Sequence, residues 1–177
     1  VEREGASVRV WGEGLPNNGE GQACLESAYL LAAVGRRPNL ADLGLAEIGV
    51  TLTERGLVKV DQYMRTEVDN IYAIGDIVPS PQLAHMAAAE AIVAAEHAFG
   101  LDPQSLNYEQ CPSATYCQPE VASVGLTQEK AEELGYKVAV GKFPLAALGK
   151  ANISGHTDGF VKIVAEAESK KVLGLHI

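Results

Sequence analysis

The pattern of apolar and polar positions predicts several short strands in the first half of the chain. Residues 7–11 alternate polar and apolar side chains, which is typical of a half-exposed strand. Residues 28–34 form an unbroken apolar run, as expected for a strand buried on both faces of a parallel sheet, although a short buried helix shows the same pattern. Residues 57–61 again alternate apolar and polar side chains and predict a short strand. Residues 70–76 predict another buried strand, which ends in Gly-Asp.

Turn-forming residues separate these segments. Residues 12–21 include the run Pro-Asn-Asn-Gly and predict a loop. Pro38 disfavours helix at the residue before it, so the apolar run should stop sharply. Residues 40–56 are punctuated by Leu and Gly and predict an irregular connection.

One long helix is predicted over residues 82–99. Pro81 suits the first turn of a helix, and Gly100 suits the position just past its end. Ala, Glu, Val and Leu dominate the segment, and only the β-branched pair Ile92-Val93 is less favourable. A strand ending in Gly-Asp, a short loop with Pro and then a helix is the layout of an α/β cofactor site.

The character of the chain changes at about residue 106. Strands are predicted at 114–116, 121–124 and 137–140, a short helix at 128–134, and a hairpin that pairs 159–164 with 171–177. Strands joined mostly by antiparallel links, with one small helix, favour an α+β domain. The expected fold class is therefore α/β, followed by an α+β domain.

Composition narrows the function classes. The chain has 177 residues and a net charge of −9, which argues against nucleic-acid binding and against attraction to an anionic membrane surface. No apolar run approaches the roughly 20 residues that a membrane-spanning helix needs. The chain opens on Val1 without a basic-then-apolar leader, so we expect a cytoplasmic protein. Residues 171–177 read as a strand still in progress, and we expect a fragment that is truncated on both sides.

The cysteines and histidines do not predict a disulfide scaffold or a metal centre. The three cysteines are Cys24, Cys111 and Cys117, an odd number without CxxC spacing. The last two fall in a strand-like stretch rather than at a helix start, where a redox-active thiol is usually found. We expect ordinary semi-buried thiols and no metal site.

Three places could carry chemistry. Asp76 follows a predicted strand and could accept hydrogen bonds from sugar or ribitol hydroxyls, or it could be a turn and helix-capping residue. The helix start, comprising Gln82, Leu83, Ala84 and His85, could present backbone N–H groups to an electron-rich atom, or His85 could be a packing residue. The segment 35–38 (Gly-Arg-Arg-Pro) could clamp phosphate or could be a solvated loop.

These motifs occur together, and in this order, in one known family. The segments 34–39, 71–76, 83–85, 116–127, 141–144 and 158–163 make nearly the whole chain resemble the class I pyridine nucleotide-disulfide oxidoreductases. The Leu-Ala-His sequence at 83–85 is most similar to the dihydrolipoamide dehydrogenase branch. The resemblance implies that residues 1–34 end an NAD-binding domain and that residues 35–105 belong to an FAD-binding domain, both Rossmann-like. It also implies that residues 106–177 form a truncated α+β dimerisation domain.

The resemblance also implies roles for the candidate residues. Asp76 would bind the FAD ribitol, Gln82 to His85 would face the flavin, and Gly35 would lie against NAD. The implied reaction oxidises protein-bound dihydrolipoamide through an enzyme disulfide and FAD and reduces NAD. The implied partners are a second copy of the chain in a homodimer and the lipoyl domain of a 2-oxoacid dehydrogenase complex.

The resemblance has gaps and alternatives. Gln118 stands where many members have His, and Met86 replaces a common Lys, at positions that should not touch the chemistry. The family's redox cysteine pair and its His-Glu pair match no segment of this sequence, so we expect this chain alone to be inactive and assign it no catalytic residue. The alternatives are a mercuric reductase or soluble transhydrogenase of the same family, or a non-catalytic dimerisation or binding module.

Overall fold

The structure, a computed structural model, describes residues 1–12, 15 and 24–177. The chain divides into two compact units, which we call the first unit (Val1–Arg37) and the second unit (Pro38–Ile177). Each unit is described by itself. Within the part of the chain that the structure describes, no helix is long and apolar enough to cross a membrane.

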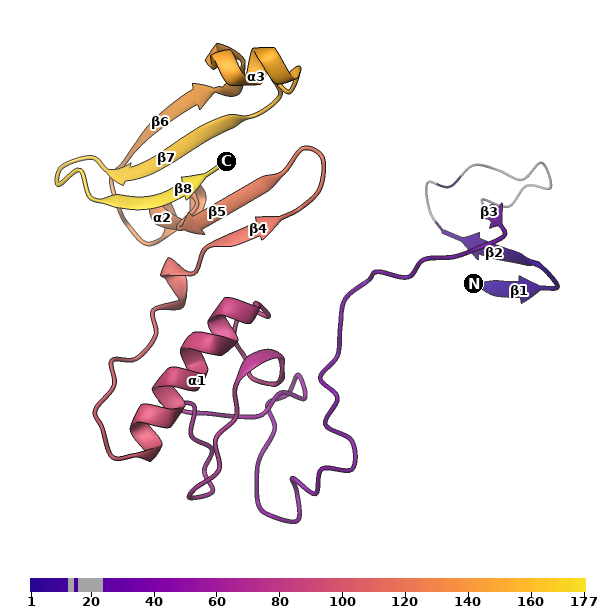
Figure 1. Ribbon diagram of the computed structural model, residues 1–177, viewed down its shortest axis with the longest axis vertical. Coiled ribbons are helices and arrows are strands. Elements are labelled where there is room, and N and C mark those ends of the chain that lie inside the picture. Colours follow the sequence, from indigo (N-terminus) through magenta and orange to yellow (C-terminus); the bar gives the residue numbers. More distant parts are fainter. Residues whose placement is uncertain (13–14, 16–23) are drawn as a thin grey trace. The chain divides into compact units, whose positions relative to one another are not determined.

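The first unit contains one small antiparallel sheet (Figure 1). Its strands are β1 (Glu2–Glu4), β2 (Ser7–Trp11) and β3 (Cys24–Ser27), in the order β1-β2-β3. The central strand β2 confirms the alternating pattern at residues 7–11. The predicted loop at 12–21 lies almost entirely outside the described residues.

The apolar run at residues 28–34 is not a strand, and that prediction is wrong for this structure. Tyr29 is 90% exposed and Val34 is 97% exposed, and the backbone there is irregular. An apolar segment becomes a buried strand only where neighbouring strands satisfy its backbone and cover its faces. The described part of the first unit pairs β1, β2 and β3 with one another and leaves this run outside the sheet.

The second unit begins with turns that enclose a small apolar core. The core comprises Val50, Val58, Ala73 and Val78, with Leu40, Leu45, Val60, Val68, Ile71 and Ile77 packed against it. The strands predicted at 57–61 and 70–76 are wrong, because only single bridges form there, Leu52 to Val58 and Arg65 to Tyr72. Their apolar positions are buried by packing of turns instead of by a ladder of strands. The Gly-Asp end of the second segment is a 3-10 turn, η1 (Gly75–Ile77).

The predicted long helix is confirmed as α1 (Ala84–Ala98). Its buried residues, Met86, Glu90, Val93 and Ala94, recur at helical spacing and define the face that packs on the turns. The helix ends at Ala98, with Phe99 as its C-cap residue, and Gly100 follows with a φ of +78°, a conformation that glycine adopts without steric cost. A 3-10 turn, η2 (Tyr108–Gln110), then leads into the C-terminal sheet.

The C-terminal sheet confirms the predicted α+β character of this part of the chain. Its five strands are β4 (Ser113–Thr115), β5 (Val121–Gly125), β6 (Val138–Pro144), β7 (Phe160–Glu166) and β8 (Val172–His176). They lie in the order β4-β5-β8-β7-β6, and every pair is antiparallel. The predicted hairpin is β7 and β8, and the predicted short helix is α2 (Gln128–Glu133).

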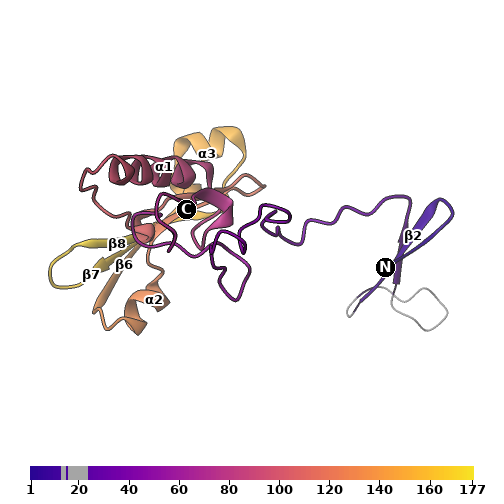
Figure 2. The same cartoon turned by 90° about the horizontal axis from the view of Figure 1, so that it is seen from below.

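The sequence pattern did not predict two short helical elements that follow β6. They are η3 (Leu145–Ala147) and α3 (Gly149–Ser154). Figure 2 shows the strands of the sheet between α2 and α3. Asn152 holds the second element in place, because its side-chain amide donates to the backbone oxygens of Ala146 and Leu148, both at 2.8 Å.

Candidate functional site

The start of α1 leaves backbone donors at an exposed position. Its N-cap residue is Leu83, which has no side chain able to cap the helix, and its carbonyl oxygen accepts from the N–H groups of Met86 and Ala87 at 3.0 Å each. The first N–H groups of any helix have no acceptor within the helix. Ala84 and His85 carry two of these groups and are both exposed. The helix start therefore offers donors and the positive end of the helix dipole to a ligand.

The turn at Gly75-Asp76 lies directly beside this helix start. The side-chain amide of Gln82 donates to the backbone oxygen of Asp76 at 3.3 Å, which joins the turn to the residues that precede α1. Gly75 has a φ of +75°, and a Cβ at that position would lie 3.4 Å from the Cβ of Ala87. Glycine therefore allows the turn to pack against the helix. Asp76 itself is an exposed residue.

The structure thus brings five of the six predicted site residues together. Asp76, Gln82, Ala84 and His85 are exposed and Leu83 is half-buried at one edge of the second unit. Gly35 belongs to the first unit and has a φ of +114°, with nothing within 4 Å of a Cβ built on it. Its assignment to the site stays a prediction.

Sequence reasoning missed one residue at the site, Glu90. Its side chain is fully buried, and its Oε2 accepts the Gly75 N–H at 2.6 Å. Its Oε1 accepts the Tyr108 hydroxyl at 3.0 Å. A signal was present, because Met86, Glu90 and Val93 share the spacing of one helix face, and a Glu on an apolar face calls for buried partners.

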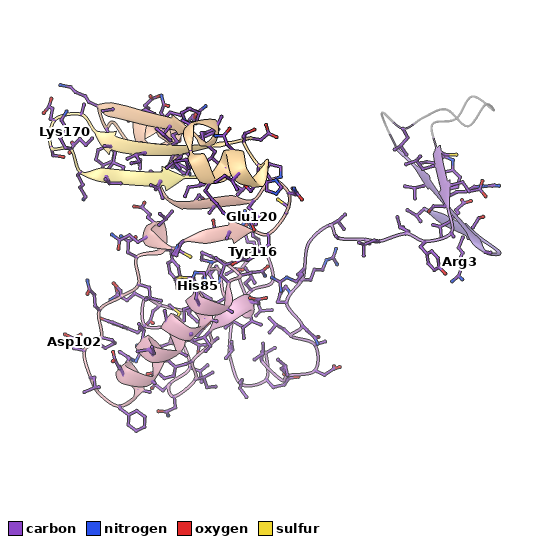
Figure 3. The ribbon with its side chains drawn as sticks, turned by 45° about the horizontal axis from the view of Figure 1, so that its top comes forward. Arg3, His85, Asp102, Tyr116, Glu120 and Lys170 are labelled. Carbon is purple, nitrogen blue, oxygen red and sulfur yellow. The ribbon has the colours of Figure 1, made fainter. Side chains whose placement is uncertain are left out.

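His85 faces a shallow pocket between α1 and the sheet. The pocket has a volume of about 410 Å³ and is lined by Leu83, His85, Tyr116, Val124, Leu175 and neighbouring residues. Figure 3 labels two of these lining residues, His85 on α1 and Tyr116 just after β4. The Sγ of Cys111 lies 3.6 Å from Nε2 of His85, and burial raises the pKa of that thiol. A raised pKa favours the thiol over the thiolate, as in an ordinary cysteine, and all three cysteines are free.

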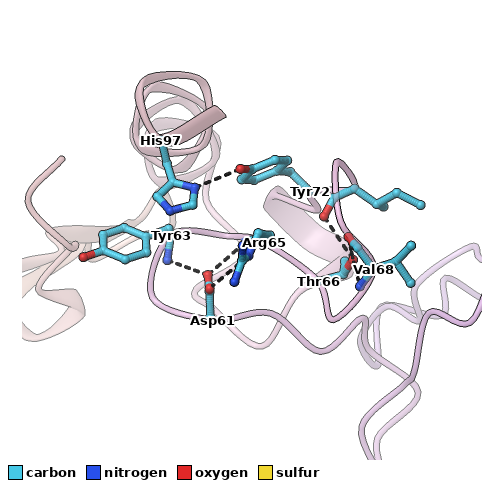
Figure 4. Close-up of polar contacts among 8 residues, drawn as sticks. Asp61, Tyr63, Arg65, Thr66, Val68, Tyr72 and His97 are labelled. Carbon is cyan, nitrogen blue, oxygen red and sulfur yellow. Dashed lines mark hydrogen bonds and ion pairs between the residues drawn. The ribbon is translucent and has the colours of Figure 1, made fainter. Parts of the chain in front are cut away.

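The other end of α1 is fixed by an aromatic and polar cluster (Figure 4). The ring of His97 stacks on Tyr63 with 4.5 Å between centroids, and its Nδ1 is 2.8 Å from the hydroxyl of Tyr72. The loop that carries these tyrosines is shaped by Asp61, whose Oδ1 accepts the N–H groups of Tyr63 at 2.8 Å and Arg65 at 3.0 Å. This cluster anchors the helix whose opposite end forms the candidate site.

Two family models match the chain. Residues 4–91 match the model described as pyridine nucleotide-disulphide oxidoreductase, and residues 111–177 match its dimerisation domain. Together they cover the segments that contain the Gly75-Asp76 turn, the start of α1 and the five-stranded sheet.

Curated relatives carry a consistent name. The chain is 46% identical over 160 residues to a dihydrolipoyl dehydrogenase of Geobacillus stearothermophilus, covering 90% of this chain and 34% of the relative. It is 48% identical over 151 residues to a dihydrolipoyl dehydrogenase of Corynebacterium glutamicum, covering 84% of this chain and 32% of the relative. The chain spans about a third of the length of the curated relatives it matches.

Two solved structures share the fold. The flavoprotein disulfide reductase RclA of Escherichia coli, described as induced by HOCl, matches with a TM-score of 0.84 at 27% identity, covering 98% of this chain and 38% of that one. LpdA of Mycobacterium tuberculosis matches with a TM-score of 0.80 at 28% identity, covering 88% of this chain and 34% of that one. The predicted combination of α/β parts followed by an α+β dimerisation domain is therefore confirmed, although the described strand pairs are all antiparallel.

Proposed function

Because the chain belongs to the pyridine nucleotide-disulphide oxidoreductase family, we propose that it forms the flavin-facing and dimerising part of a dihydrolipoyl dehydrogenase. The observation that carries the proposal is the hydrogen bond from Gln82 to the backbone of Asp76, which brings an exposed carboxylate and an uncapped helix start together. In the same proposal, residues 1–34 end an NAD-binding domain, residues 35–105 belong to the FAD-binding domain, and residues 106–177 form the dimerisation domain.

The residues at this edge fit FAD. Asp76 is exposed, and an ionised carboxylate accepts hydrogen bonds from hydroxyl groups such as those of a ribitol chain. Gly75 lets the turn that carries Asp76 pack closely against Ala87 of the helix. Ala84 is small, and its N–H and that of His85 point out of the helix start, where they suit an electron-rich carbonyl or ring nitrogen.

Each group then has a defined task. Asp76 would orient the ribitol, and the backbone of Gln82 to His85 at the start of α1 would face the flavin. The positive end of the α1 dipole favours negative charge there. FAD, when bound, supplies the two-electron relay between a disulfide and NAD. Gly35 would lie against NAD, where its missing side chain permits close approach.

The proposed reaction converts the dithiol of protein-bound dihydrolipoamide to a disulfide. Two electrons and two protons leave the dithiol, NAD⁺ takes up a hydride, and one proton is released. The partner that delivers the dithiol would be the lipoyl domain of a 2-oxoacid dehydrogenase complex in the cytoplasm. The match of residues 111–177 to a dimerisation domain supports a homodimer built through the five-stranded sheet.

A hybrid protein tests this proposal. This chain replaces the matching third of the Geobacillus stearothermophilus relative, and the purified hybrid is assayed for bound flavin by its visible absorption and for NADH formation from dihydrolipoamide. We expect a yellow, active protein, and we expect Asp76→Ala to release the flavin while Asp102→Ala, at another exposed acidic residue, retains it. Full flavin retention by Asp76→Ala would contradict the assignment. Activity with Hg²⁺ or with a second nicotinamide nucleotide, but not with dihydrolipoamide, would favour a sibling enzyme of the family.

A further inference from the structure

Glu90 is an unusual residue for its position. It lies in the middle of α1, is fully buried and shares its face of the helix with Met86, Val93 and Ala94. Burying a carboxylate is unfavourable unless hydrogen bonds replace its water. An apolar side chain would fill this buried position at a lower desolvation cost. The two hydrogen bonds of Glu90 therefore indicate a role beyond packing.

The two oxygens of Glu90 join two separate segments. Oε2 accepts the backbone N–H of Gly75 at 2.6 Å, one residue before Asp76. Oε1 accepts the hydroxyl of Tyr108 at 3.0 Å, in the η2 turn that leads into the sheet. A carboxylate with a donor at each oxygen has the pattern of the ionised form, which accepts hydrogen bonds only. Hydrogen bonds to a charged acceptor are the stronger kind.

Tyr108 is suited to be a permanent donor. Burial, and then the hydrogen bond to Glu90 and its negative charge, raise the pKa of Tyr108 to about 12. The phenol therefore keeps its proton throughout the ordinary pH range and continues to donate to Glu90. The same hydroxyl lies 3.8 Å from the Sδ of Met64 in the turns below α1.

We infer that Glu90 is a positioning residue that fixes the Gly75-Asp76 turn and links it to Tyr108 at the entrance to the five-stranded sheet. The inference rests on the proposed function insofar as the turn receives FAD. Glu90 does not touch the ligand in this scheme. It fixes the backbone of the turn that carries Asp76. Through Tyr108, it also couples the conformation of that turn to the segment that leads to the dimerisation domain.

Three variants of the full 177-residue chain test the link without any cofactor. Glu90→Gln keeps the shape of the side chain but removes its charge, and Tyr108→Phe removes one donor while leaving the carboxylate. Glu96→Gln, on the same helix, is the matched control. Amide hydrogen exchange at Gly75 is measured by NMR, and the ring signal of Tyr108 is followed as the pH is raised.

We expect exchange at Gly75 to become about tenfold faster in Glu90→Gln, because two donors are left with one neutral acceptor oxygen in place of a charged carboxylate. The pKa of Tyr108 should fall below about 12 in the same variant but stay raised, because burial of Tyr108, the largest cause of its raised pKa, remains. Tyr108→Phe should raise exchange at Gly75 by a smaller factor, and Glu96→Gln should change neither quantity. Unchanged exchange and unchanged Tyr108 titration in Glu90→Gln would overturn the inference.

The flavin-loaded hybrid protein supplies a second measurement. We expect Glu90→Gln to weaken FAD binding about tenfold, through misplacement of Asp76, and Glu96→Gln to leave it unchanged. Faster exchange at Gly75 together with unaltered FAD affinity would show that the link is structural only, which overturns the positioning role. If the hybrid without any of these substitutions holds no flavin, the proposed function fails, and the exchange and titration results alone decide whether Glu90 makes the link.

Discussion

Gly125 and Gly174 lie opposite each other where β5 pairs with β8, with no room for a side chain at either position. A Cβ on Gly174 would lie 2.1 Å from the backbone oxygen of Leu126, and a Cβ on Gly125 would lie 2.2 Å from that of Leu173. Both obstacles are backbone atoms, which cannot rotate away as a flexible side chain could. The two glycines therefore permit the close approach that joins the two halves of the sheet.

Gly174→Ala should destabilise the chain strongly. The added methyl group forces β5 and β8 apart, at a cost of about 3 kcal/mol in the free energy of unfolding. Gly141→Ala is the matched control, because it lies on β6 of the same sheet with nothing within 4 Å of a Cβ, and it should change stability by less than about 0.5 kcal/mol. Urea denaturation measures both, and equal stability of the two variants would contradict the packing described for β5 and β8.

Thr127→Ala should loosen α2. The Thr127 hydroxyl accepts the Lys130 N–H at 3.1 Å and caps the first turn of this short helix. Loss of an N-cap of this kind costs about 1 kcal/mol. Thr127→Ser retains the hydroxyl and should retain most of the stability. Thermal unfolding and the exchange rate of the Lys130 amide measure the effect in both variants. A similar loss of stability in Thr127→Ala and Thr127→Ser would mean that the methyl group of Thr127 matters more than its capping hydroxyl.

Thr51→Val should reduce the acid sensitivity of the second unit. The hydroxyl of Thr51 donates to Glu67, and this bond is the main cause that lowers the pKa of that carboxyl below its ordinary value. A carboxyl with a depressed pKa in the folded state contributes stability above its unfolded pKa of about 4.3 and loses it as the pH falls through the lower folded value. The difference in unfolding free energy between neutral and acidic pH should therefore be smaller in Thr51→Val. Thr115→Val, on β4, should keep the difference found without substitution.

Tyr72→Phe should weaken the anchor at the C-terminal end of α1. The variant loses the hydrogen bond between the Tyr72 hydroxyl and His97 but leaves the stacking of His97 on Tyr63 in place. We expect a loss of about 1 kcal/mol in unfolding free energy. Tyr116→Phe removes a hydroxyl from a residue that is 89% exposed and should change little. Indistinguishable unfolding curves for the two variants would mean that the Tyr72 bond adds no stability.

Local patterns predicted the C-terminal sheet better than the segments before it. The hairpin of β7 and β8 follows from alternating residues on both sides of a polar turn, and α1 follows from composition between Pro81 and Gly100. The errors at residues 28–34 and 70–76 have a common cause. Apolar runs report a tendency to be buried, whereas a strand also needs a partner with free backbone groups, which lies elsewhere in the sequence.

The candidate site was predictable only where its residues are close in sequence. Asp76 and Gln82 are separated by a short loop, so their association in one turn-to-helix unit could be expected. The links made by Glu90 to Gly75 and Tyr108 cross longer stretches of chain and depend on which face of α1 is buried. That face could be read from the spacing of Met86, Glu90 and Val93, but the partners of the carboxylate could not.

The position of β8 between β5 and β7 also bears on how the chain emerges from the ribosome. The hairpins β4-β5 and β6-β7 are synthesised first, and β8 then pairs with the open edge of each. Until β8 arrives, the free edges of β5 and β7 expose unpaired backbone groups that can pair with another nascent chain. Slow emergence of residues 172–176 from the ribosome should therefore promote aggregation of the nascent chain.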